Sequence, residues 1–191
     1  MPRLFTGIEI PEEVRERLAS FKAPLPGARW IDPENLHITL RFAGDVDNIV
    51  AREFVDGLAA IDEAAFEVRI VGLGAFGGNS PRILWAGVEG GPALEALARA
   101  NERAARNAGL APEKRDFYAH VTLARMQHAR PDAVARFLER GGAFRTEPFL
   151  VDRFVLFSAR PQTGGGPYVV EEEFLLSGFG FDALRETDAR R

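Results

Sequence analysis

Two periodicities of apolar residues run through this chain, and together they predict interleaved strands and helices. Apolar and polar residues tend to alternate, as they do in strands, over residues 3–10, 36–42, 66–73, 82–88, 117–125, 149–159 and 168–177. Apolar residues recur at intervals of three to four, as they do in amphipathic helices, over residues 11–21, 48–61, 92–108 and 131–140. Strands and helices that interleave in this way favour an α+β fold, with helices packed on mainly antiparallel sheets.

Segments rich in glycine and proline mark the turns between these elements. The turn at residues 77–81 separates two alternating segments, which we therefore expect to form a hairpin. A short strand is expected at Trp30 and Ile31. No stretch reads as a linker between domains, so we expect one unit over residues 1–191, with a frayed polar tail at residues 182–191.

A four-residue phrase occurs twice, as HITL at residues 37–40 and as HVTL at residues 120–123. Two of the three histidines of the chain open these phrases. Side chains of a strand point alternately to opposite faces, so His and Thr of each phrase share one face and the two apolar residues share the other. We interpret the repetition as a duplication: two pseudo-symmetric lobes, each an antiparallel sheet with outer helices, contribute one strand each to a central cleft.

Composition narrows the possible functions. The apolar share of 46% and the charged share of 27% are those of a soluble globular protein. The absence of cysteine excludes a disulfide framework, a thiolate metal site and a catalytic thiol. The amino terminus lacks the apolar run of a signal peptide, and no stretch approaches the length of a membrane span, so we expect a cytoplasmic protein with no membrane contact.

Charge narrows the choice of substrate. The net charge of −4 argues against a protein that holds long nucleic acid through its phosphates, while a small phosphate ester or an RNA end fits. Only Lys22 and Lys114 among the 24 basic residues are lysines. Phosphate contacts are therefore expected to come from arginine, whose planar guanidinium can donate two parallel hydrogen bonds.

The side chains of the two phrases suit acid–base chemistry on a phosphate. Imidazole has an unperturbed pKa of about 6.5, so at neutral pH one histidine can accept a proton while another donates one. The hydroxyls of Thr39 and Thr122 can donate hydrogen bonds to an oxyanion, where preorganised donors stabilise developing charge. His37, His120, Thr39 and Thr122 are therefore the candidate site residues, and phosphoryl transfer is the expected reaction class.

Two arginines compete for a place in this site. Arg125 lies five residues after His120, so in a regular strand it would point to the opposite face. A bulge or a strand end after Leu123 would redirect it toward the site. Arg41 shares the face of His37 but lies about 13 Å further along a strand, and is either a substrate contact or solvated.

Other chemistries fit less well. Two histidines can bind zinc only with a third ligand. The third histidine, His128, lies in a turn before a helix and is expected on the surface, and neither phrase has a carboxylate at ligand spacing. A serine hydrolase is disfavoured because no Gly-x-Ser-x-Gly elbow occurs. We expect no metal and no other cofactor.

Paired His-x-Thr phrases on facing strands resemble the signature of the 2H phosphoesterase superfamily. Further blocks resemble, in order, those of the RNA 2′,3′-cyclic phosphodiesterase family, also known as the 2′-5′ RNA ligase family: residues 3–11, 30–31, 35–46, 81–88, 120–125, 156–158 and 166–168. The resemblance covers about residues 3–177. It implies a bilobal α+β fold around a central cleft and metal-free hydrolysis of a 2′,3′-cyclic phosphate to a 2′-phosphate, with an RNA end or a nucleoside cyclic phosphate as substrate.

The resemblance also implies roles that the symmetric phrases cannot assign. His37 resembles the proton donor to the departing 3′ oxygen, and His120 resembles the base that activates water. Thr39 and Thr122 would bind the phosphate oxygens, and the family pattern adds Arg125 to them. A nucleobase can stack on aromatic rings, for which Phe5, Trp30 and Tyr118 are candidates, although each is also a plausible core residue.

The chain departs from the family pattern at two positions beside the phrases. Ala119 replaces a frequent proline before the second histidine, and Ala43 replaces a frequent leucine. Both changes bear on substrate fit more than on chemistry. Two alternatives stay open: a noncatalytic module that binds phosphate-ended RNA, and ligation of 2′-5′ ends in the same site. Nothing in the sequence calls for an obligate protein partner.

Overall fold

The computed structural model of the protein describes residues 3–159 and 166–178, and the predicted tail at residues 182–191 lies outside them. The strands in these ranges are β1 (Arg3–Glu9), β2 (Ala28–Trp30), β3 (His37–Asp45), β4 (Phe66–Phe76), β5 (Ile83–Glu89), β6 (His120–Met126), β7 (Phe149–Val151), β8 (Arg153–Ala159) and β9 (Tyr168–Leu175). The helices are α1 (Glu12–Ala19), α2 (Asn48–Ala59), α3 (Gly91–Asn107) and α4 (Pro131–Gly141), with a 3-10 turn η1 (Pro33–Asn35) before β3.

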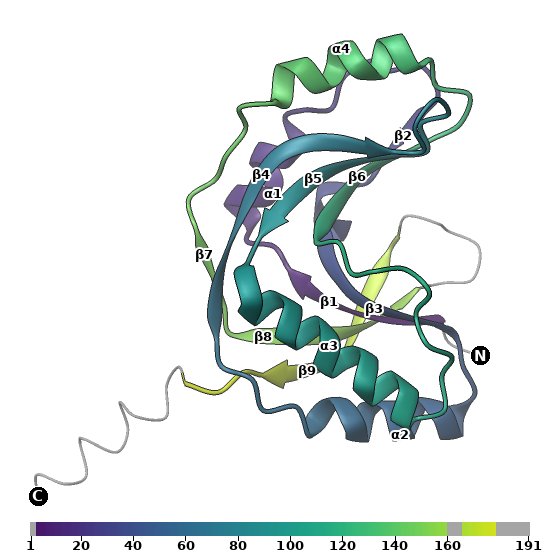
Figure 1. Ribbon diagram of the computed structural model, residues 1–191, viewed down its shortest axis with the longest axis vertical. Helices are drawn as coiled ribbons and strands as arrows, with labels where there is room; N and C mark the ends of the chain where they lie inside the picture. Colours follow the sequence, from purple (N-terminus) through teal and green to yellow (C-terminus); the bar gives the residue numbers. More distant parts are fainter. Residues whose placement is uncertain (1–2, 160–165, 179–191) are drawn as a thin grey trace, which may run out of the picture.

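The strands form one curled sheet, whose order along the main path is β7, β4, β5, β6, β3, β1, β8 and β9, with β2 paired to β6 (Figure 1). The pairs between these strands are antiparallel, including the predicted hairpin of β4 with β5. We call β4, β5 and β6, with β7 and β2, the β6 half, and β3, β1 and β8, with β9, the β3 half. The α+β class and the two antiparallel lobes expected from the sequence are confirmed.

The order of elements repeats along the chain, but the repeats exchange strands. The first repeat runs β1, α1, β3, α2, β4, and the second runs β5, α3, β6, α4, β8. Nevertheless, β4 of the first repeat pairs with β5 of the second, and β8 of the second pairs with β1 of the first. Each half of the sheet therefore contains strands from both repeats. The chain passes between the halves more than once, which is why no linker is visible in the sequence.

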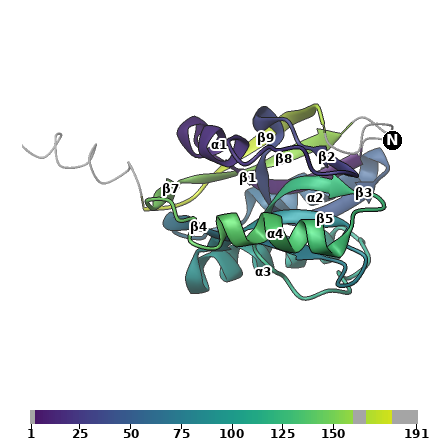
Figure 2. The same ribbon diagram turned by 90° about the horizontal axis from the view of Figure 1, so that it is seen from above.

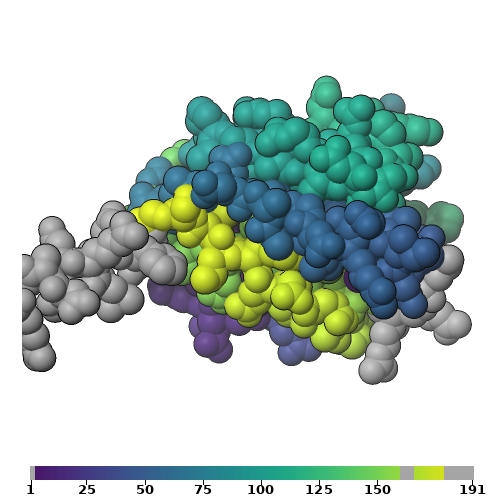
Figure 3. Space-filling model, turned by 90° about the horizontal axis from the view of Figure 1, so that it is seen from below, coloured from purple at the N-terminus to yellow at the C-terminus, as the bar shows by residue number. Residues whose placement is uncertain are grey.

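The helices cover the outside of the sheet. Helix α3 packs on β3 and β4, α2 packs on α3, and α4 packs on β4. Figure 2 shows α1 and α3 on opposite sides of the strands. The contact of α2 with α3 is close, since a Cβ atom on Gly57 would lie 3.2 Å from the Cβ atom of Ala104. Figure 3 shows these two helices, in blue and teal, forming one surface beside β9 in yellow.

Two strand boundaries differ from the sequence expectation. The segment 149–159 is two strands, because Asp152 leaves the ladder; β7 before it pairs with β4, and β8 after it pairs with β1. The second phrase begins its strand at His120 rather than at residue 117. The carbonyl of Tyr118 lies 2.7 Å from a ring nitrogen of His120, so it serves the imidazole instead of a neighbouring strand.

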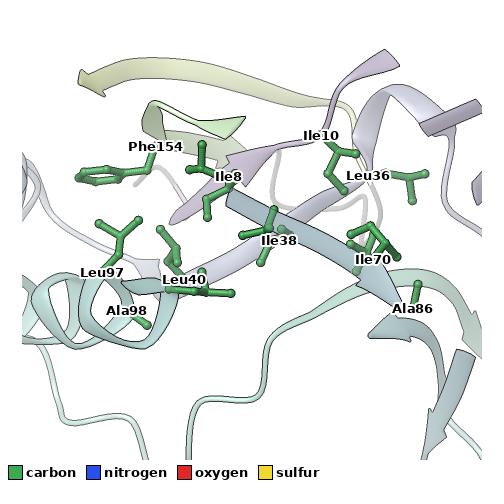
Figure 4. Packing of buried hydrophobic residues seen from close by; sticks show 14 of the residues in the cluster. Ile8, Ile10, Leu36, Ile38, Leu40, Ile70, Ala86, Leu97, Ala98 and Phe154 are labelled. Carbon is green, nitrogen blue, oxygen red and sulfur yellow. The ribbon is translucent and has the colours of Figure 1, made fainter. Parts of the chain in front are cut away.

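The core lies beneath the junction of the two halves. Ile38 of β3 opposes Val121 of β6, and neither side chain has any solvent exposure. Figure 4 shows Ile38 in the middle of the apolar cluster, with Ile8 of β1 close by and Leu40 beside Leu97 of α3. The apolar residues of the two phrases thus fix the strands that carry the histidines. Within the described ranges, no helix is long and apolar enough to cross a membrane.

Truncation at this junction tests its weight in the fold. We expect Ile38→Ala to lower the free energy of unfolding by about 2–5 kcal/mol, because it removes buried methyl groups and leaves a cavity between the halves. Ile49→Ala is the matched control, since the side chain of Ile49 is 74% exposed. It should change stability by less than about 0.5 kcal/mol. Equal losses for the two variants in urea unfolding would show that the junction is not a critical part of the core.

Candidate active site

Both phrases carry the same β-bulge at the same position. Along β3, the residues before and after Leu40 oppose consecutive residues of β1, so Leu40 itself has no partner. Along β6, the residues before and after Leu123 oppose consecutive residues of β5, so Leu123 has none. A bulge inserts one extra residue and reverses the face that each later side chain takes. The duplication therefore extends beyond the four letters to the local backbone.

This reversal decides the positions of the two candidate arginines. Arg125 takes the face of the phrases and lines the cavity beside them, as the bulge after Leu123 requires. Arg41 turns into the interior, where it is 7% exposed, forms an ion pair with Glu102 and donates to the Ala111 carbonyl at 2.5 Å. Arg41 is thus neither a substrate contact nor solvated, because regular alternation ends one residue before it.

The two histidines and two threonines share one small patch of the sheet. The pairing of β3 with β6 is centred on the apolar residue of each phrase. One residue away on either side, this antiparallel register sets His37 opposite Thr122 and Thr39 opposite His120. Opposed Cβ atoms on one face lie about 5 Å apart, and diagonal ones about 7–8 Å. The four side chains therefore mark a quadrilateral, with histidines on one diagonal, threonines on the other and a pseudo-twofold axis through its centre.

Each imidazole is held by the backbone two residues before it. The Nδ1 atom of His37 lies 2.8 Å from the Asn35 carbonyl oxygen, and Nδ1 of His120 lies 2.7 Å from the Tyr118 carbonyl oxygen. A carbonyl only accepts, so Nδ1 carries the hydrogen and donates in both rings. In the neutral ring the lone pair then resides on Nε2, which makes Nε2 the atom available for proton transfer.

Three aromatic rings surround His37. The ring centroids of Phe5, Tyr168 and Phe157 lie 4.9, 5.1 and 5.4 Å from that of the imidazole. Tyr168 is kept there by its backbone amide, which donates to the Asn35 side-chain oxygen at 3.1 Å. Asn35 therefore fixes the imidazole through its main chain and one wall of the surrounding cage through its side chain.

A second aromatic cage surrounds His120. The ring centroids of Phe76, Tyr118 and Trp85 lie 5.1, 6.3 and 6.4 Å from its own. The indole of Trp85 lies against Gly74, where an added Cβ atom would stand 2.2 Å from a ring atom. Glycine is required at that position because the ring occupies the space of any side chain. Both imidazoles are thus partly shielded from water by flat apolar walls.

This environment lowers the pKa of both histidines. Burial is the main cause at His37, where the pKa falls to about 4, although its hydrogen bond to the backbone opposes the shift. The charges of His120 and Arg125 add to the lowering at His37. Burial also lowers the pKa of His120, again against its backbone hydrogen bond and with a contribution from Arg115. In the free protein at pH 7, both imidazoles are therefore mainly neutral.

A cavity of 290 Å³ opens over the quadrilateral on the side of His37. Neither Thr39 nor Thr122 uses its hydroxyl in a hydrogen bond within the described part of the chain, so both can donate to a ligand. The cavity is lined by Arg3, Phe5, Ile31, Asn35, His37, Thr39, Phe42, Thr122, Arg125, Ala159 and Tyr168. A larger hollow of 530 Å³ adjoins it and shares Asn35, His37 and Tyr168.

The three candidates for base stacking take different positions. Phe5 lines the cavity but is only 3% exposed and packs under His37. Trp30 does not line the cavity: its indole donates to the Ala23 carbonyl at 3.2 Å and its ring packs on Phe137. Tyr118 is 55% exposed and remains accessible beside His120. Of the three, Tyr118 alone presents an open ring.

Sequence reasoning did not single out the other cage residues. Phe157, Tyr168 and Trp85 lie within blocks that carry the family resemblance, which was the available signal. Phe76 ends a strand next to a glycine turn, and no sequence feature distinguishes it. Within the described ranges, no three His, Cys, Asp or Glu side chains cluster as metal ligands, and His128 is exposed in the turn before α4.

Known proteins resemble this chain in sequence. The family model described as LigT like Phosphoesterase matches residues 8–85 and 88–168. A protein of Aquifex aeolicus named RNA 2′,3′-cyclic phosphodiesterase is 32% identical over 174 residues, which cover 87% of this chain and 91% of the relative. A protein of Aeropyrum pernix with the same name is 40% identical over 119 residues, or 61% of this chain and 66% of the relative.

Solved structures resemble it in fold. The crystal structure of TT0787 of Thermus thermophilus superposes with a TM-score of 0.76 at 25% identity, over 93% of this chain and 100% of the other. The structure of E. coli LigT complexed with 3′-AMP gives a TM-score of 0.73 at 24% identity, over 93% of this chain and 99% of the other. These matches extend across both halves of the curled sheet.

The lowered pKa of His37 makes stability depend on pH. The unfolded chain has a pKa of about 6.5 at this residue, so the neutral form stabilises the fold above pH 6.5, and that contribution is lost as pH falls toward 4. Between pH 7 and pH 4 we expect the unfolding free energy of the parent to fall by about 2–3 kcal/mol relative to His37→Gln. His128→Gln is the control and should follow the parent. Parallel curves for the parent and His37→Gln in urea titrations would contradict this environment.

Proposed function

The chain belongs to the family of LigT like phosphoesterases, and we propose that it hydrolyses the 2′,3′-cyclic phosphate of an RNA or nucleotide end to a 2′-phosphate, by acid–base catalysis with two histidines and without a metal. The names of the relatives support the substrate class. The observation that carries the mechanism is the quadrilateral in which each histidine stands opposite a threonine, across the junction of β3 and β6.

The reaction needs one proton removed and one supplied. In this proposal Nε2 of His120 takes a proton from water as the water oxygen attacks phosphorus. Nε2 of His37 gives a proton to the 3′ oxygen as its bond to phosphorus breaks. The diagonal spacing of about 7–8 Å between the Cβ atoms leaves room for an attacking and a leaving oxygen on opposite sides of one phosphorus. Proton exchange with water then restores both rings.

The remaining side chains act on charge. The free hydroxyls of Thr39 and Thr122 and the guanidinium of Arg125 are placed to donate to the nonbridging oxygens, whose charge the site must stabilise. A bound phosphodiester anion also favours the protonated form of a nearby imidazole. Substrate binding therefore raises the histidine pKa values from their low values in the free protein, and lets His37 hold the proton that it donates.

Removing either imidazole tests this division of labour. On a nucleoside 2′,3′-cyclic phosphate we expect His37→Ala and His120→Ala each to lower kcat/KM by about 10²–10⁴-fold, the usual worth of a positioned acid or base. Circular dichroism should show an intact fold in both variants. His128→Ala should retain the parental rate. Retention of activity by both site variants would refute the mechanism, and binding without turnover by the parent would identify a noncatalytic module instead.

A chelator tests the absence of a metal. We expect dialysis against EDTA to leave the hydrolysis rate within about twofold of its initial value, because two imidazoles supply both proton transfers. The assay repeated with added Mg²⁺, Mn²⁺ or Zn²⁺ measures any rescue. A rate lost in EDTA and restored by one of these ions would contradict the metal-free mechanism while leaving the reaction itself in place.

A further inference from the structure

The candidate active site is symmetric in three respects and asymmetric in one. The histidines, the threonines and the carbonyls that hold Nδ1 are each repeated about the pseudo-twofold axis. Both strands then bulge at the leucine of the phrase. The first side chain beyond each bulge to face the cavity is Phe42 on β3 and Arg125 on β6, at the same distance in sequence from the two histidines. An aromatic ring and a cation thus occupy equivalent positions.

The two residues have contrasting surroundings. Phe42 is 45% exposed, its ring centroid lies 6.4 Å from that of Phe5, and the guanidinium of Arg3 stands 5.7 Å from its centroid. That guanidinium is balanced by Asp45, at 3.5 Å. Arg125 is exposed and forms no hydrogen bond or ion pair with any described residue. One end of the cavity is therefore aromatic with its cation balanced, and the other presents an unbalanced cation.

A site with a twofold axis offers a phosphodiester two orientations, related by half a turn. Between them the two histidines exchange roles, because the oxygen that leaves beside one imidazole in the first orientation leaves beside the other in the second. Identical histidines and threonines give neither orientation an advantage. A single unbalanced guanidinium does, since the nonbridging oxygens of the phosphate carry the negative charge and pair with it, while the nucleoside favours the aromatic end.

We propose that the difference between Phe42 and Arg125 fixes the orientation of the substrate, and with it which histidine donates the proton and which accepts it. The inference rests on the proposed function. It assigns Phe42 a positioning role that neither its apolar character nor its place after the phrase indicates. It also explains how a duplicated site performs a reaction that needs two unlike roles.

The roles can be read with a change of leaving atom. In the analogue of a nucleoside 2′,3′-cyclic phosphate with sulfur in place of the bridging 3′ oxygen, the leaving thiolate departs without a proton, and a thiol reagent detects it. Loss of the acid should cost about 10²–10⁴-fold on the oxygen substrate but less than about tenfold on the sulfur substrate. Loss of the base should cost similar factors on both. In the parent we expect His37→Ala to be the variant that sulfur rescues.

The decisive variants alter the pair itself. In Phe42→Arg combined with Arg125→Phe, sulfur should rescue His120→Ala and no longer His37→Ala. In Phe42→Arg alone, which carries arginine at both positions, the two histidine variants should be rescued equally, within about threefold. Phe42→Leu is the matched control, because it removes the ring without adding charge. It should keep the parental assignment whatever its rate.

Each other result overturns the inference. Unchanged rescue of His37→Ala alone in Phe42→Arg, or a folded Phe42→Arg without activity, would show that arginine at the second position does not open the second orientation. Reversal in Phe42→Leu would assign orientation to the ring rather than to charge. A parent that does not hydrolyse the oxygen substrate refutes the proposed function at the outset, whereas an active parent with an unaltered assignment in the exchanged variant refutes the inference alone.

Discussion

The arrangement of the site depends on one contact between the two halves of the sheet, where Ile38 of β3 opposes Val121 of β6. This register is specified by burial, because a slip of one residue would turn both apolar side chains out of the core. The same register sets each histidine opposite a threonine on the other face. Beyond this contact the bulges at Leu40 and Leu123 redirect both strands. Packing on one face of the sheet therefore fixes the chemistry on the other.

The surroundings of the histidines add a second constraint. Each imidazole is tied by Nδ1 to a carbonyl of its own chain and enclosed by three aromatic rings. The rings limit hydration and so lower the pKa of both histidines, while the carbonyls fix the tautomer. The free site thus holds two neutral acceptors and awaits an anion. A negatively charged substrate supplies the condition under which one of them becomes an acid.

Much of this could be predicted from the sequence, because the informative signals are local. Alternation of apolar residues located the strands, and the repeated phrase identified both histidines and both threonines without any structure. The face of Arg125 was predictable only conditionally, since a bulge has no reliable sequence signature, and the same bulge made the expectation for Arg41 wrong. Regular alternation places Arg41 beside His37, whereas the structure pairs it with Glu102 in the interior.

The cages were the least predictable part, because they are assembled from distant segments. Phe157 and Tyr168 reach His37 through the exchange of strands between the repeats, which places β8 beside β1. No period or spacing in the sequence reports such a neighbour. Trp30 illustrates the reverse error, since an aromatic residue close to the site in sequence packs against α4 instead.

The central claim is that His37 and His120 face one phosphate together. NMR titration of the histidine side chains, with and without a nucleoside 2′-phosphate, tests it directly. An anion between the two rings favours both protonated forms, so saturation should raise the pKa of His37 and of His120 and leave the signals of the exposed His128 unchanged. A rise at one of the two site histidines alone, or at neither, would contradict the account.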